Sequence, residues 1–102
     1  MVCKVKSLSD LFQVLADPTR LQIVELLNSE CRSVSALVKA TGRSQPLVSH
    51  HLRILRICGL VEGERRGAMT YYRLTDDSVW EAVERCRQLV IASETEASRI
   101  AV

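Results

Sequence analysis

A polar run between residues 44 and 50 carries side chains that can bind another molecule through hydrogen bonds. It contains Ser44, Gln45, Ser49 and His50. Hydroxyl, amide and imidazole groups can each donate to or accept from the edges of nucleic-acid bases, and the amide of Gln45 can bond an adenine twice at once. The chemistry that these residue types favour is recognition of a partner.

Basic residues gather around the same run. Residues 43–73 hold six arginines against two glutamates, whereas residues 74–102 hold three arginines against six carboxylates. Arginine is preferred where a planar, two-pronged contact to phosphate or guanine is needed. The middle third of the chain therefore predicts a nucleic-acid surface, with a solvated charged face as the alternative.

Four cysteines, at positions 3, 31, 58 and 86, could bind metal ions or undergo oxidation. Because they are far apart and no secretory signal accompanies them, we expect reduced thiols in a cytoplasmic protein. The chain has no Cys-x-x-C pair, which argues against a zinc ribbon and a thioredoxin-like site. Packing as a small apolar side chain is the default expectation for each cysteine.

The composition excludes several classes of protein. A chain of 102 residues predicts one small domain over residues 1–102. No apolar run reaches the roughly 18 residues that span a bilayer, so no membrane partner is expected. An enzyme is not predicted, because the sequence has no Gly-rich phosphate loop, no carboxylate pair placed for acid–base work and no recognisable Cys–His spacing.

Two helices are expected in the first third of the chain. Leu8 and Leu11 begin a helical repeat, which predicts an N-terminal arm and helix over residues 1–16. Asp17 and Pro18 then predict the start of a second helix. An aspartate side chain caps the exposed N–H groups of a helix, and proline is accepted at the first helical position.

The next two helices predict a helix-turn-helix over residues 33–59. Ser33 is expected to cap the first of them and Gly42 to end it, while Ser44 caps the second and Gly59 ends it. In this motif the second helix enters the major groove of DNA, with its N-terminal residues at the base edges. A plain helical hairpin packed on a core is the alternative.

Residues 60–74 predict a β-hairpin, because strand-favouring residues flank an expected turn at Arg66 and Gly67. Arg65 and Arg66 at the tip cannot pack into a core. They are expected to touch phosphate or a minor groove, or to keep an exposed tip soluble. The hairpin completes a winged helix-turn-helix, a fold that is mainly α with a small β-hairpin.

A C-terminal dimerisation helix is expected over residues 75–97, capped by Thr75 and frayed after Glu94. A core of this size is small, so we expect this helix and the first helix to form a homodimer interface. Folding back onto its own domain is the alternative. The expected interface residues are Leu8, Leu11, Val79, Val83, Cys86 and Val90.

Three ordered motifs resemble those of the ArsR/SmtB family of winged-helix metalloregulatory repressors. Residues 17–23 are similar to the D-P-x-R-L-x-I segment of the family's second helix. Residues 44–52 are similar to its S-Q-P-x-x-S-x-H-L recognition helix, and residues 59–74 to its G-L-V, R-x-G and Y-Y-x-L wing. The resemblance covers residues 8–90. It implies a homodimer that binds a double-stranded DNA operator near its own promoter and is released by an inducer, often a metal or metalloid ion.

The resemblance also implies which residues contact DNA. Gln45 would read adenine, Arg53 would reach a phosphate and His51, unlike its neighbour, would be packed. The full set of expected contacts is Ser44, Gln45, Pro46, Ser49, His50, Arg53, Arg65 and Arg66.

The chain departs from the family pattern at the sensor. A C-V-C motif of the family corresponds to residues 33–35, Ser-Val-Ser, and of a site on the last helix only Asp76 is matched. Serine is a poor ligand for soft ions, and one carboxylate is not a zinc site. Cys3 and Cys31 remain candidates for binding arsenite or a soft divalent metal ion. A thiol-redox switch, an ion-independent regulator and a winged-helix protein-interaction module stay open as alternatives.

Overall fold

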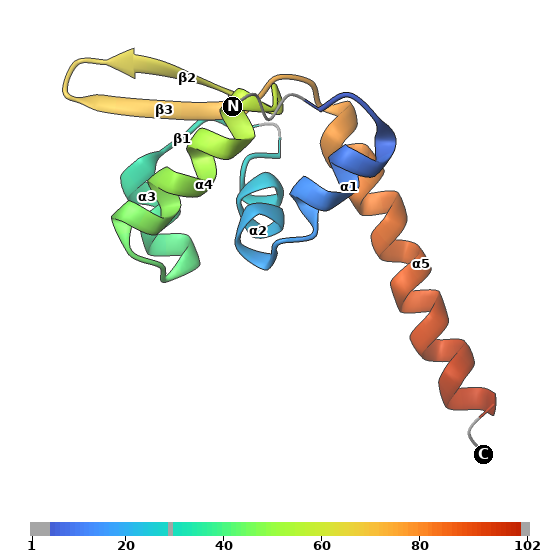
Figure 1. Cartoon of the computed structure of the whole chain (residues 1–102). Helices are drawn as coiled ribbons and strands as arrows, with labels where there is room; N and C mark the ends of the chain where they lie inside the picture. The colour runs from blue at the N-terminus through green and yellow to red at the C-terminus, as the bar shows by residue number, and fades with distance from the viewer. Residues whose placement is uncertain (1–4, 29, 101–102) are drawn as a thin grey trace.

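The computed structural model describes residues 5–28 and 30–100, with side chains described as far as residue 93. A bundle of short helices carries a β-hairpin on one side and a long C-terminal helix on the other (Figure 1). The elements are α1 (Leu8–Leu15), α2 (Pro18–Leu26), β1 (Arg32–Ser33), α3 (Val34–Thr41), α4 (Gln45–Ile57), β2 (Val61–Arg66), β3 (Met69–Leu74) and α5 (Ser78–Ile100).

The starts of α2 and α3 are set by the side chains that the sequence predicts as caps. Asp17 Oδ2 accepts from the backbone N–H groups of Thr19 and Arg20, both at 3.0 Å. The Ser33 hydroxyl accepts from the N–H of Ala36 at 3.1 Å at the start of α3. These bonds satisfy N–H groups that have no partner within the helix.

The core lies where α2, α3 and α4 meet. Ile23 and Val24 of α2, Leu37 of α3 and Val48 and Leu55 of α4 are completely buried. On α4 the buried residues Val48, Leu52 and Leu55 recur every three or four residues, so one face of the helix packs inward and the opposite face remains available. The core therefore fixes which side of α4 meets solvent.

The sheet has one strand more than the predicted hairpin. The short β1 pairs antiparallel with β3, with Arg32 opposite Tyr72, so the described strands lie in the order β1-β3-β2. A two-residue strand carries no periodicity, and its pairing depends on contacts distant in sequence. The turn also lies one residue later than predicted, because Arg66 stays in β2 opposite Met69. Gly67, at φ 63°, begins the turn.

The start and end of α5 differ from the prediction. Thr75 does not cap the helix; its hydroxyl donates to the carbonyl of Gly59 at 2.7 Å. Asp76 accepts from the N–H of Ser78 instead, at 2.8 Å. The helical backbone continues to Ile100, three residues beyond the predicted end. Among the helices that the structure describes, none is long and apolar enough to cross a membrane.

Candidate nucleic-acid interface

The outward face of α4 displays the polar residues that the sequence predicts as contacts. Val48, Leu52 and Leu55 occupy the buried face. The predicted contact residues of this helix and its cap are all exposed: Ser44, Gln45, Pro46, Ser49, His50 and Arg53. The helix thus presents hydroxyl, amide, imidazole and guanidinium groups to solvent, within and just after its first two turns, as a helix that reads base edges must.

Hydrogen bonds around Gly59 position the wing relative to α4. The N–H of Leu60 donates to the carbonyl of Leu55 at 2.9 Å, which closes the C-terminal end of the helix. Thr75, directly after β3, donates to the carbonyls of both Gly59 and Leu60. Gly59 has φ 82°, a conformation that costs little only for glycine. The β2–β3 wing and the reading helix are therefore joined at their bases.

The wing arginines are not equivalent. Arg66 Nη2 lies 2.8 Å from Glu64 Oε2, and its guanidinium is 4.9 Å from the centre of the Tyr71 ring. Hydrogen bonding to Glu64 raises the pKa of Arg66. Arg65 points to the other face of the hairpin, and its Nε donates to the carbonyl of Gly67 at 3.2 Å. Arg65 is therefore the tip residue whose charge is more available for phosphate.

The six arginines of residues 43–73 also differ in whether they form an ion pair. Arg73, like Arg66, forms an ion pair, with Glu62 at 2.5 Å. Within the described part of the chain, the other four arginines of the segment have no carboxylate within ion-pair distance. These are Arg43, Arg53, Arg56 and Arg65. The unneutralised charge thus lies on the loop before α4, on α4 and at the wing tip.

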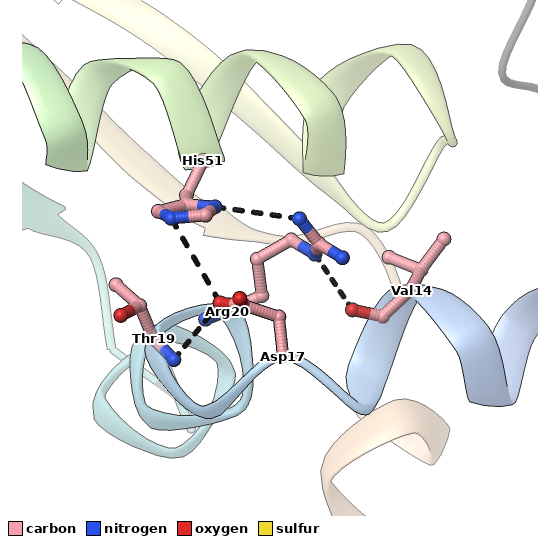
Figure 2. A network of polar contacts seen from close by, with 5 residues as sticks. All are labelled: Val14, Asp17, Thr19, Arg20 and His51. Atoms are coloured by element: carbon pink, nitrogen blue, oxygen red, sulfur yellow. Dashed lines mark hydrogen bonds and ion pairs between the residues drawn. The ribbon is translucent and has the colours of Figure 1, made fainter.

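Directly behind the polar face, His51 is part of a buried polar network (Figure 2). His51 is only 8% exposed, and its side chain lies between Arg20 of α2 and Asp17, the N-cap residue of that helix. His51 Nδ1 is 3.4 Å from Arg20 Nη1, and His51 Nε2 is 3.8 Å from Asp17 Oδ2. Burial lowers the pKa of His51, and hydrogen bonding to the backbone of Arg20 lowers the pKa of Asp17. His50 is exposed, and its ring lies 5.3 Å from that of His51, so the two neighbouring histidines have different surroundings.

The cysteines are scattered. Cys58 is buried, as expected for a packing residue, whereas Cys86 is exposed in the single chain and lines an apolar groove. Cys31 is exposed beside the wing, and Cys3 lies outside the described residues, so their pairing stays a prediction. No group of three or more potential metal ligands occurs among the residues described. Ser33 does not fit a metal either, because its buried hydroxyl already caps α3.

An apolar groove of about 800 Å³ runs between α1, α2 and α5. It is lined by five of the six predicted interface residues: Leu11, Val79, Val83, Cys86 and Val90. Leu8 lies outside the lining but is 66% exposed on the same helix as Leu11. Phe12, absent from the predicted set, also lines the groove and is 53% exposed. Phe12 lies four residues after Leu8, on the same face of the helix, and this spacing could have identified it as an interface residue.

In the described structure, α5 packs back onto its own domain over its first turns. Val79 and Val83 are partly buried against the core. Arg87, farther along, forms an ion pair with Glu25 of α2. Beyond this point Val90 remains 59% exposed, and α5 extends away from the bundle (Figure 1).

Comparisons with known proteins agree with this arrangement. Residues 17–63 match the family described as bacterial regulatory protein, arsR family. The chain is 34% identical over 89 residues to the uncharacterized HTH-type transcriptional regulator MJ1325 of Methanocaldococcus jannaschii, covering 84% of this chain and 98% of that one. It is 48% identical over 67 residues to the HTH-type transcriptional repressor SmtB of Mycobacterium tuberculosis, covering 66% of this chain but only 50% of the repressor.

A solved structure shows the same architecture. The homodimeric winged helix-turn-helix DNA-binding domain Mb0332 of Mycobacterium bovis, described as a possible ArsR-family regulator, is 35% identical with a TM-score of 0.69. The match covers 84% of this chain and 79% of that one. These relatives are named as regulators or repressors, which supports the prediction that the chain is not an enzyme.

Proposed function

The chain belongs to the ArsR/SmtB family of winged helix-turn-helix transcriptional regulators, and from this premise we propose that it represses transcription as a homodimer bound to operator DNA. The observation that carries the proposal is the outward face of α4, where polar side chains face solvent opposite the buried core residues. The first turn would meet base edges in the major groove. Arg53 and Arg65 would meet phosphates on either side.

The apolar groove supports the homodimer. Its lining residues on α1 and α5 are exposed to a degree that a monomer in water does not favour. A second copy related by a two-fold axis would cover the same residues on both chains. It would also place two copies of α4 on one face of DNA, as a palindromic operator requires.

The test is binding of the purified protein to short duplexes that tile the DNA upstream of its own gene. We expect selective binding to one duplex, and we expect His50→Ala to weaken it about ten-fold because a base or phosphate contact is lost. The matched control is Gln88→Ala, on the exposed part of α5. Equal binding by His50→Ala and the parent would contradict the assigned role of α4. Absence of any DNA binding would favour a protein-interaction module.

For the inducer, the proposal is arsenite or a soft divalent metal ion bound through Cys31 and Cys3. The support is chemical, since thiolates select soft ions and Cys31 is exposed. The bound duplex is titrated with arsenite, cadmium, zinc and peroxide, using the parent, Cys31→Ser and Cys3→Ser. The site is supported if arsenite or cadmium releases the parent from the duplex and each cysteine substitution abolishes this release. Release by peroxide alone supports a redox switch, and release by none supports an ion-independent regulator.

A further inference from the structure

We propose that His51, with Arg20 and Asp17, is a positioning unit that sets the orientation of α4 for DNA and weakens DNA binding when His51 is protonated. The inference rests on the proposed function, because it assigns to these residues a role in presenting the reading face. None of the three is an expected DNA contact. They lie behind α4, on the side that faces α2 (Figure 2).

The unit joins three helices at one point. Arg20 extends from α2, and its Nε donates to the carbonyl of Val14 at 2.7 Å, in the last turn of α1. The same guanidinium reaches His51 of α4 through Nη1, at 3.4 Å. Asp17 caps α2 through the N–H groups of Thr19 and Arg20 and faces the other ring nitrogen of His51. A shift of α4 along or about its axis would therefore break the contacts of His51 with Arg20 and Asp17, and Arg20 links this point to α1.

The contacts determine which ring nitrogen of His51 carries the proton. A guanidinium only donates, so the Nδ1 atom facing Arg20 must accept and must be unprotonated. The proton of the neutral ring then sits on Nε2, directed toward the carboxylate of Asp17. Only a neutral ring with this tautomer satisfies both partners at once.

Protonation of His51 would place two donors against each other at the Nδ1 position. The charged groups that act on the ring are Asp17, which favours the protonated form, and Arg20, His50 and Arg43, which oppose it. Burial adds to the opposition, and the net result is a lowered pKa for His51. The Asp17 oxygen that faces the ring, Oδ2, also accepts both cap bonds. Acid is therefore expected to disrupt the unit.

The position of the unit gives it influence over recognition. His51 directly follows Ser49 and His50, two expected contact residues, and the centre of its ring lies 5.3 Å from that of His50. A change in how His51 packs against α2 would move the contact residues relative to the base edges, while the wing arginines would keep their phosphate contacts. Loss of the unit should thus reduce selectivity more than general DNA affinity.

The experiment measures binding of the full chain to the selected upstream duplex and to a random-sequence duplex of equal length, from about pH 7.5 to about pH 4.5, because the pKa of His51 is lowered. The variants are His51→Leu, which fills the site without an acceptor, and His51→Gln, which can accept from Arg20 and donate to Asp17 but does not titrate. Ile23→Val, a buried change on α2 outside the unit, controls for a general loss of stability. Circular dichroism establishes a temperature at which every variant is folded.

We expect His51→Leu to weaken selective binding about ten-fold and random-duplex binding little. His51→Gln should bind near the parent's affinity at neutral pH and lack the parent's loss of affinity in acid. Because His50 is present in both proteins, the ratio of their affinities isolates the effect of His51. The inference would be overturned if a folded His51→Leu protein kept the parent's selectivity, or if His51→Gln kept the parent's pH profile. Neither result would contradict the proposed function. A parent protein that selects no duplex would instead overturn the proposed function.

Discussion

At the scale of single residues, local charge pairing decides which arginines can act on DNA. Arg65 and Arg66 are neighbours in sequence, yet strand alternation sends them to opposite faces of the wing. Arg66 then meets Glu64 and the ring of Tyr71, while Arg65 donates to the carbonyl of Gly67 and forms no ion pair among the described residues. A neutralised guanidinium releases fewer counterions on binding, so the two residues should contribute differently to the salt dependence.

We therefore predict that Arg65→Ala lowers DNA affinity and reduces the slope of log affinity against log salt by about one, with little change in sequence preference. Arg66→Ala, its matched control, should change the slope less because Glu64 already offsets its charge. The measurement is a salt titration of duplex binding for the parent and both variants. A slope equal to the parent's in Arg65→Ala would argue against a phosphate contact there.

At the scale of elements, a side chain that caps a helix of the helix-turn-helix is not free to bind a metal ion. Ser33 stands at the first position of the motif that carries cysteines in related regulators, and its side chain is committed to the start of α3. Ser35 follows two residues later on the exposed side of α3. The cap is buried, and a helix end that loses its acceptor there has no water to replace it.

Ser33→Ala should accordingly lower the free energy of unfolding by about 1 kcal/mol, since it removes the bond to the N–H of Ala36. Ser35→Ala, on the same helix and exposed, should change it by less than about half of that value. Urea unfolding followed by circular dichroism compares the two. Equal effects would show that the Ser33 hydroxyl does not stabilise the helix start.

At the scale of the whole molecule, the chain divides into a reading head and an apolar arm. The molecule measures 57 × 31 × 22 Å because α5 extends beyond the bundle. Its first turns pack on the core, and Arg87 joins it to Glu25 of α2. The groove beyond remains open, with Phe12 and Val90 on its two sides. A second copy is the occupant expected from the homodimeric relative.

Val90→Glu should convert the dimer into a monomer, because it places a charge in an apolar contact made twice by symmetry. Ile57→Glu, a matched change at an exposed apolar residue outside the groove, should leave the dimer intact. Analytical ultracentrifugation gives the masses, and duplex binding should fall together with dimerisation. A Val90→Glu protein that stays dimeric would place the interface elsewhere.

The sequence by itself determined the starts of α2, α3 and α4, the buried face of α4 and the family motifs, because caps and apolar periodicity act between residues close along the chain. Tertiary structure alone decided the pairing of β1 with β3, the exposure of Cys86 and the neutralisation of Arg66 by Glu64. It also brought His51 to Arg20 and Asp17, across a sequence separation of about thirty residues. These contacts depend on how elements pack in space, and packing between distant segments leaves no periodic signal in the residues that form it.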